Sequence, residues 1–282
     1  MHIVITGAGG NLGSKLTAHL QSAPWCSIIT GIDPRPLTDS GKLRAVSADL
    51  RDPYDRRWID PTRQADAVVH FAAQNPAPDS NWVEATQSID MTMNLLQWAG
   101  QARCRFVFAS SNHVMGGYKD APLPPGHQLT SVTPPRPGTR YFDGDDYRTP
   151  TAYGASKLMG ERAVAARCAS SLLTGVNVRI GWVQPGENRP GTIDLRGAGQ
   201  RTGPALPDQE EIDRGMAWFR GMWLSNRDFL QLMERAITAP ADHWPSRAIV
   251  VNGTSNNTGT LWNLDDGRRW LGYAPVDDIA AG

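Results

Sequence analysis

The chain has 282 residues, with 28 basic and 28 acidic side chains, so its formal net charge at pH 7 is zero. This balance excludes a whole-protein field that would attract nucleic acid or an anionic membrane, and we expect neither as a partner. A small molecule is the expected partner, and the length is sufficient for a substantial α/β core.

The cysteines and the N-terminal segment give no indication of a zinc site or a signal peptide. Cys26, Cys104 and Cys168 are far apart and lack the spacing of a zinc site, so we expect reduced thiols and no metal. The segment MHIVITGAGG has neither the basic n-region nor the long apolar region of a signal peptide, and no apolar run reaches about 18 residues. These features predict a cytoplasmic protein.

Short apolar runs in the first two thirds of the chain are typical of strands buried on both faces of a parallel sheet. They cover residues 2–7, 27–33, 65–73, 105–111 and 175–181, with a further candidate before residue 47. Helical spacing of apolar residues occurs between them, as in Leu12, Leu16 and Leu20, in 85–100 and in 152–166. This alternation predicts an α/β fold with a doubly wound parallel sheet.

The pattern changes after residue 181. Segments 184–191 and 196–208 have loop composition, whereas helices are expected at 209–221, 226–238 and 265–273 and an edge strand at 247–253. This second part is too interrupted to fold alone. We therefore predict a single domain over 1–282, in which 182–282 mainly form a small irregular substrate-binding cap and closing elements.

The first strand ends in TGAGGNLG, which places Gly7, Gly10 and Gly13 at the opening of a helix. Such glycines permit a tight turn and let the backbone approach a pyrophosphate, whose charge meets the N–H groups of the helix N-terminus. The strand-turn-helix context distinguishes a dinucleotide-binding loop from a chance glycine pattern. Residues 1–181 are therefore expected to form mainly a dinucleotide-binding Rossmann core.

Asp33 ends the second strand, 20 residues after Gly13. A carboxylate there accepts the ribose hydroxyls of an adenosine and repels a 2′-phosphate, which favours NAD over NADP. Asp33 could alternatively be a turn residue before Pro34, and Arg35 is a counter-signal, because it could pair with a 2′-phosphate. We predict NAD as the cofactor.

Further residues at strand ends and in the glycine turn are expected to line the cofactor site. They are Asn11, Leu12, Asp49, Leu50, Phe71, Ala72, Ala73, Ser110 and Ile180. For the two alanines, ordinary packing of small residues is an equally good explanation.

The motif YGASK places Tyr153 and Lys157 four residues apart, so their side chains share one helical face. A phenol with a pKa near ~10 is a poor base at neutral pH, but a neighbouring ammonium favours the phenolate. Ser111, at the end of the fifth predicted strand, is positioned to hold a substrate oxygen. These observations predict Ser111, Tyr153 and Lys157 as catalytic residues, with the last two also contacting the cofactor.

The segments TGAGGNLG, HFAA, FVFASSNHVMG and YGASKLMGE resemble the extended short-chain dehydrogenase/reductase superfamily, also called the NAD-dependent epimerase/dehydratase superfamily. The resemblance covers most of residues 1–181 and implies an NAD-binding sheet with the catalytic set named above. Ser88 departs from the family pattern, which often has an asparagine there.

FASSNHVMG, RIGW, MWLSNRDF and the later NGTSNNTGTLWNL with LGY resemble uronate dehydrogenases most closely. That resemblance implies NAD-dependent oxidation of C1 of a free, acidic sugar to its lactone. By analogy Asn75, Ser111, Asn112 and Tyr153 contact the sugar. Trp182 departs from the pattern, because those enzymes usually have a small serine there; a hexuronate or a sulfonated hexose is therefore expected.

Histidine, arginine and tryptophan side chains are further candidates for the substrate site and the cap around it. His113 is either a structural hydrogen-bonded residue or a substrate contact, and we include it with Trp182 in the expected site. The arginine that would bind an acidic group has no unambiguous counterpart; Arg189 and Arg220 are candidates, followed by Arg196 and Arg201. Trp218, Trp223 and Trp262 are expected in the core of the cap.

Three other functions are alternatives to a sugar dehydrogenase. A nucleotide-sugar epimerase is the main alternative, although about 100 residues after 181 form a short cap for a sugar diphosphate. A dehydratase usually has an Asp-Glu pair where this chain has Asn112 and His113, and a silent NAD sensor would lack Tyr153 or Lys157. We also expect a homo-oligomer, a dimer or higher.

Overall fold

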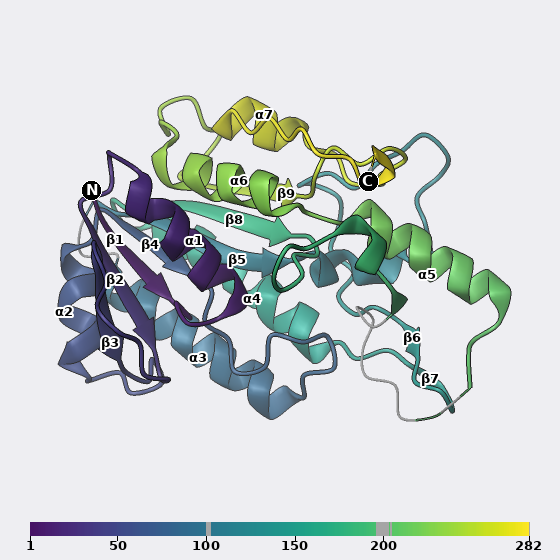
Figure 1. Ribbon diagram of the computed structural model, residues 1–282, viewed down its shortest axis with the longest axis horizontal. Helices are drawn as coiled ribbons and strands as arrows, with labels where there is room; N and C mark the ends of the chain where they lie inside the picture. The colour runs from purple at the N-terminus through teal and green to yellow at the C-terminus, as the bar shows by residue number, and fades with distance from the viewer. Residues whose placement is uncertain (100–102, 196–202, 204, 282) are drawn as a thin grey trace.

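A computed structural model describes residues 1–99, 103–195, 203 and 205–281. Within these residues, seven parallel strands form one sheet in the order β3-β2-β1-β4-β5-β8-β9 (Figure 1). Their bounds are β1 (His2–Thr6), β2 (Ile28–Asp33), β3 (Leu43–Ser47), β4 (Ala67–His70), β5 (Arg105–Ser111), β8 (Thr174–Ile180) and β9 (Ala248–Gly253). The predicted doubly wound parallel sheet is confirmed.

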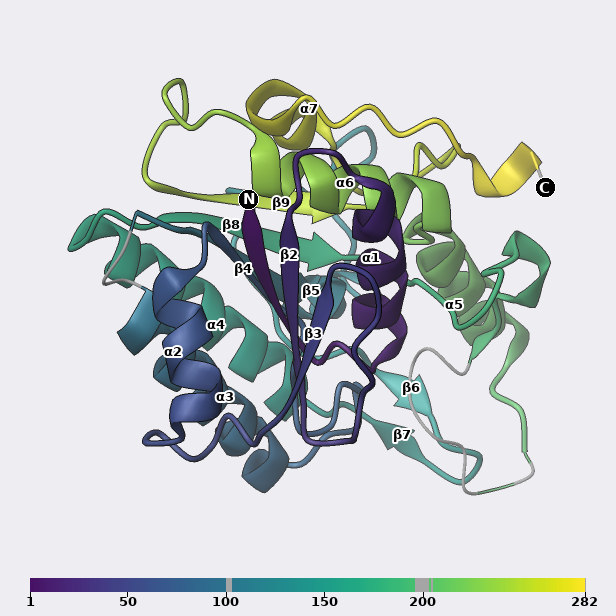
Figure 2. The same ribbon diagram turned by 60° about the vertical axis from the view of Figure 1, so that its left-hand side comes forward.

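Helices cover both faces of the sheet (Figures 1 and 2). One face carries α2 (Arg56–Gln64), α3 (Trp82–Ala99) and α4 (Ala152–Ala169), and the other carries α1 (Asn11–Ser22), α6 (Asn226–Thr238) and α7 (Asp265–Leu271). Successive residues of a strand point to opposite faces, so Ile3 and Ile5 of β1 pack with α1 and α6 while Val4 packs with α2 and α3. This two-sided burial explains the continuous apolar strands.

The strand order reverses between β1 and β4. Chain segments β1 to β3 extend to one side and β4 onward to the other. In open sheets of this kind, a crevice forms at the carboxyl ends of the strands where the order reverses. The topology therefore directs Gly7, after β1, and Phe71, after β4, to the same crevice.

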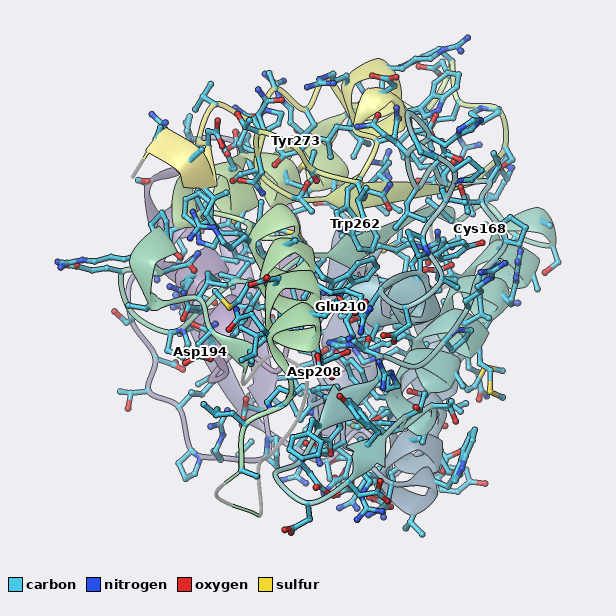
Figure 3. The ribbon with its side chains drawn as sticks, turned by 90° about the vertical axis from the view of Figure 1, so that its right-hand side faces the viewer. Cys168, Asp194, Asp208, Glu210, Trp262 and Tyr273 are labelled. Atoms are coloured by element: carbon cyan, nitrogen blue, oxygen red, sulfur yellow. The ribbon has the colours of Figure 1, made fainter. Side chains whose placement is uncertain are left out.

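A third apolar cluster lies beyond the carboxyl ends of the strands. It joins the 3-10 helix η1 (Asn112–Tyr118), α5 (Gln209–Gly221) and the C-terminal segment through Val114, Met115, Trp218, Trp223 and Trp262. Figure 3 looks onto this side of the molecule, with α5 toward the viewer and Asp208 and Glu210 labelled at its start. The three tryptophans predicted for the cap core are buried in this cluster, as expected.

Some elements differ from the predictions. Helix α2 was not predicted, because it is short and contains Pro61, although its N-cap Asp55 accepts a hydrogen bond from Arg57 N. A small antiparallel pair, β6 (Tyr141–Phe142) and β7 (Tyr147–Arg148), lies in a segment with no strand signal. Two short 3-10 turns, η2 (Pro190–Thr192) and η4 (Ile279–Ala281), complete the elements of the described chain.

Among the described residues we looked for a membrane-spanning helix, a metal-binding cluster and the state of the cysteines. None of their helices is both long and apolar enough to cross a membrane. The part of the chain that the structure describes contains no cluster of three or more His, Cys, Asp or Glu side chains suited to a metal. The three cysteines are buried free thiols.

Candidate active site

A cleft of about 820 Å³ opens at the carboxyl ends of β1, β2, β4, β5 and β8. Every residue predicted to contact the cofactor or to act in catalysis lines it. These residues are Gly7, Gly10, Asn11, Leu12, Gly13, Asp33, Asp49, Leu50, Phe71, Ala72, Ala73, Ser110, Ser111, Tyr153, Lys157 and Ile180. The cleft thus brings the glycine turn and the YGASK helix together.

The glycine turn is closely packed. A Cβ on Gly13 would lie 2.2 Å from Gly7 O, and Gly7 has a φ of +66°, a conformation that favours glycine. The N-cap residue of α1, Gly10, provides no side-chain cap, and the first turn has no acidic residue. The N–H groups at this helix start are therefore available to a pyrophosphate, and the turn fits the diphosphate of a dinucleotide.

The side chain of Asp33 lies at the β2 end of the cleft and is only 2% exposed. Its Oδ1 accepts from Arg35 N (3.0 Å) and Nε (2.9 Å), and its Oδ2 from Gly9 N (3.0 Å) and Arg35 Nη2 (3.1 Å). Burial alone would raise the pKa of the Asp33 carboxyl, but these hydrogen bonds and the charge of Arg35 hold it below its usual value. Asp33 is therefore a carboxylate at neutral pH.

Ser111, Tyr153 and Lys157 meet at the other end of the cleft. The Ser111 hydroxyl lies close enough to the Tyr153 phenol to lower the pKa of that phenol. Lys157 Nζ donates to Ala109 O at 2.8 Å and lies 5.7 Å from the centroid of the Tyr153 ring. A serine, a tyrosine and a lysine are thus positioned around one point beside the cofactor part of the cleft.

The pKa of Tyr153 differs from the sequence-based expectation. Burial raises the pKa of the phenol above its usual value, and the hydrogen bond with Ser111 offsets only part of this rise. Burial lowers the pKa of Lys157 to about 8. Burial therefore has the largest effect on the pKa of this phenol, and the lowering of that pKa by the neighbouring ammonium stays a prediction.

Asn112 and His113 follow Ser111 in η1 and also line the cleft. Asn112 is 4% exposed; its Nδ2 donates to Ile180 O at 3.1 Å, whereas its buried Oδ1 has no partner among the described residues. His113 Nδ1 is 2.7 Å from Thr139 Oγ1, and its ring packs edge-on against Tyr153. The orphaned Asn112 oxygen is an acceptor suited to a ligand hydroxyl.

Other residues of the predicted substrate site lie elsewhere. Asn75 does not line the cleft; its Nδ2 donates to Glu84 Oε2 at 3.1 Å. Arg189 is exposed and pairs with Glu187, and Arg220 donates to Ile279 O. Of the predicted residues outside the catalytic set, Trp182, Asn112 and His113 do line the cleft, while Arg196 and Arg201 lie outside the described residues.

Several residues of the cleft were not predicted from the sequence. They include Arg51, Gln74, Ala77, Pro78, Gly181, Val183 and Met222. Gly181 could have been predicted, because it is the glycine of the RIGW segment that ends β8. A Cβ at this position would lie 2.0 Å from Met222 O. Met222 itself comes from the end of α5 and reaches the cleft because Trp182 N donates to Met222 O.

The loop that carries Trp182 is hydrogen-bonded to α1. Asn11 Nδ2 donates to Val183 O at 2.9 Å, and Lys15 Nζ donates to Gly186 O. Asn188, with a φ of +55°, holds the other end of this loop by donating to Leu224 O. The loop after β8, which carries Trp182, and the start of α1 are therefore directly connected.

A buried ion pair joins β8 to α4, next to the elements that carry Ser111 and Lys157. Arg179 of β8 donates from Nε and Nη2 to Glu161 of α4 at 2.9 and 3.0 Å. Ser110 Oγ also donates to Glu161, at 2.6 Å. Glu161 is four residues after Lys157, and Ser110 precedes Ser111, so these bonds link the two elements that carry Lys157 and Ser111.

Comparison with known proteins agrees with this geometry. Residues 3–184, well over half of the chain, match the model of the NAD dependent epimerase/dehydratase family. The chain belongs to this family. Its cofactor is therefore NAD, as predicted.

Family members of similar length are similar over the whole chain. An L-arabinose 1-dehydrogenase (NAD(P)(+)) from Haloferax volcanii is 30% identical, over 99% of this chain and 97% of its own length. An NAD-dependent glucose-6-phosphate dehydrogenase from the same organism is also 30% identical, over 99% and 94%. The crystal structure of a glucuronic acid dehydrogenase from Chromohalobacter salexigens has 25% identity and a TM-score of 0.72, over 99% and 86%. The predicted resemblance to uronate dehydrogenases is confirmed.

The Glu161–Arg179 pair generates a stability prediction. Glu161→Gln leaves a buried guanidinium without its counter-charge, so we expect the unfolding free energy in urea to fall by about 3 kcal/mol. The control is Glu161→Gln combined with Arg179→Met, which removes the uncompensated charge and should recover part of the loss. A single variant within about 1 kcal/mol of the wild type would contradict this assignment.

Two buried neutral histidines generate a pH prediction. Burial lowers the pKa of His70 to about 3 and that of His113 to about 4. Below pH 6.5 the unfolded chain binds protons that the folded protein does not, so the unfolding free energy falls as the pH decreases. Each histidine should contribute about 1.4 kcal/mol per pH unit between about pH 6 and 5.

The measurement is urea unfolding across this pH range, with His113→Gln as the comparison. The variant keeps the carboxylates that also titrate, so the difference in slope isolates one histidine. Equal slopes for the two proteins would show that His113 is not held neutral.

Proposed function

We propose that the protein oxidises C1 of a free sugar to a lactone with NAD as the acceptor. The observation that carries the proposal is the convergence of Ser111, Tyr153 and Lys157 at the end of the dinucleotide cleft. The Haloferax volcanii relative, named a 1-dehydrogenase of L-arabinose, supports oxidation at C1. Bound NAD would supply the hydride acceptor and a positive ring charge that favours the phenolate.

In this proposal each residue has a separate role. Tyr153 removes the proton of the anomeric hydroxyl, and Ser111, whose hydroxyl lies beside the phenol, orients the same substrate oxygen. Lys157 places an ammonium beside the ring and offsets the effect of burial once the phenol ionises. Asn112 Oδ1 accepts from a sugar hydroxyl, because that oxygen has no partner among the described residues.

The remaining wall of the sugar end is neutral in its described residues. His113, whose pKa burial lowers to about 4, is uncharged at pH 7, and Gln74, Trp182 and Met222 carry no charge. An acidic group on the sugar, as in a hexuronate or a sulfonated hexose, remains part of the prediction. Its partner would have to be an arginine other than Arg189 or Arg220 as they are placed here.

The test is a screen for NADH formation with L-arabinose and other neutral aldoses, hexuronates, glucose 6-phosphate and a sulfonated hexose. We expect NADH together with a lactone, detected by NMR. Conversion of a UDP-sugar without net NADH, and no NADH from any free sugar, would instead support the nucleotide-sugar epimerase alternative.

Tyr153→Phe is the decisive variant. Removing the phenolic oxygen should lower kcat by about 10²- to 10⁴-fold, because the general base is lost. NAD binding, measured by calorimetry, should stay within about threefold, since the cofactor contacts are otherwise retained. Tyr54→Phe, at an exposed tyrosine outside the cleft, is the matched control. Retention of most activity by Tyr153→Phe would exclude this role for the residue.

A further inference from the structure

A group of charged side chains, here called the α5 ion cluster, lies outside the cleft at the start of α5. Its members are three basic and three acidic residues: Lys119, Arg140, Arg214, Asp120, Glu210 and Glu211. The side chains of Lys119 and Glu211 are only 1% and 5% exposed. That of Glu210, labelled in Figure 3, is 86% exposed. The cluster is therefore balanced in charge and buried at its centre.

Glu211 is the residue through which α5 contacts two other segments of the chain. Its Oε1 accepts a hydrogen bond from Lys119 Nζ. Its Oε2 accepts from Arg140 Nη2 at 2.8 Å and from Arg214 Nη2 at 2.6 Å. Lys119 directly follows η1, Arg140 directly precedes β6, and Arg214 belongs to α5 itself. One carboxylate thus connects η1, the segment before β6 and α5.

The first two of these segments lead to the sugar end of the cleft. Helix η1 begins with Asn112 and His113, which both line the cleft. Thr139, the neighbour of Arg140, has its Oγ1 2.7 Å from His113 Nδ1, and Gly138 N donates to His113 O. The position of the His113 ring therefore depends on both segments that Glu211 holds.

Helix α5 leads to another part of the same end. Glu211 lies in its first turn, and Met222 directly follows its last residue, about 16 Å away along the axis. Met222 lines the cleft, and its O accepts a hydrogen bond from Trp182 N at 2.8 Å. The ring of Phe219 packs edge-on against that of Trp182. A shift of α5 along its axis would therefore displace both Met222 and the support of Trp182.

Apolar packing alone does not fix where α5 lies along its axis. Trp218 and Phe219 are buried in the third apolar cluster, but the hydrophobic effect is non-directional and favours burial without selecting one axial position. Hydrogen bonds between charged groups weaken steeply when their distances and angles change. The bonds of Glu211 therefore add the directional constraint that the apolar contacts lack.

We propose that Glu211 is a positioning residue for the sugar. Its carboxylate holds η1, the segment before β6 and α5 in one arrangement, and this arrangement places Asn112, His113 and Met222 around the substrate. Glu211 does not line the cleft, so it acts through these residues and not by contact with the sugar or NAD. This role rests on the proposed function, because it takes the sugar to bind at this end.

The test is Glu211→Gln in the full chain, assayed by NADH formation. The sugar is L-arabinose, D-glucuronate or glucose 6-phosphate, whichever the wild type oxidises fastest. We expect KM for that sugar to rise about tenfold, with kcat within about threefold and the Kd of NAD within about twofold of the wild type. A loss of stability alone would reduce the amount of active enzyme, and therefore kcat, without raising KM.

Glu210→Gln is the matched control. Glu210 is the exposed neighbour of Glu211 and contacts Arg214 of the same helix, so this variant should keep the KM of the wild type. Glu211→Gln combined with Lys119→Met restores the charge balance but not the bond to η1. It should regain part of any lost resistance to urea while KM stays raised. The proposal is overturned if KM returns to the wild-type value in this double variant, or if KM of Glu211→Gln is within about twofold of it.

Amide hydrogen exchange provides a readout that needs no sugar. Glu211→Gln should speed exchange in residues 113–119 and 136–140 by about tenfold and leave β1 and β4 unchanged, because only the first two segments lose their link to α5. Unchanged exchange in both segments would overturn the proposal even if a sugar is oxidised. Faster exchange there, with no NADH from any free sugar, would support the role of Glu211 in holding these segments and overturn the dehydrogenase proposal instead.

Discussion

The buried pair between Arg179 and Glu161 is the constraint on which the catalytic end depends. It links β8 to α4, and Ser110 connects β5 to the same carboxylate. Residues one position or one helical turn away then line the cleft: Ser111, Ile180 and Lys157. Burying such a pair costs desolvation free energy that offsets the attraction between the two charges. Its main effect is therefore to fix one arrangement of β5, β8 and α4.

Much of the fold could be predicted, because its signals are local. Two-sided burial makes the strands continuous apolar runs, and the glycine turn and the Tyr-Lys spacing each need only a few neighbouring residues. Helix α2 shows the limit. Its inward face consists mainly of Trp58, Ile59 and Thr62, and Pro61 interrupts the pattern, so only packing against the sheet reveals it.

The sugar end could not be predicted equally well, because contacts distant in sequence form it. Arg189 pairs locally with Glu187 and Arg220 with the C-terminal segment, so neither reaches the cleft. Met222 reaches it only because Trp182 bridges to Trp223 across about 40 residues of chain. The cap core of Trp218, Trp223 and Trp262 determines these positions, and no short motif encodes it.

The link between α1 and the loop after β8 affects how kinetic data on the cofactor helix can be interpreted. The side chain of Asn11 is committed to Val183 O, next to Trp182, even though Asn11 belongs to the glycine turn. A substitution of Asn11 therefore removes a hydrogen bond that holds the loop of Trp182 and Val183, in addition to changing the glycine turn. A raised KM for the sugar in such a variant would be a geometric effect transmitted through one amide, and not evidence that Asn11 contacts the sugar.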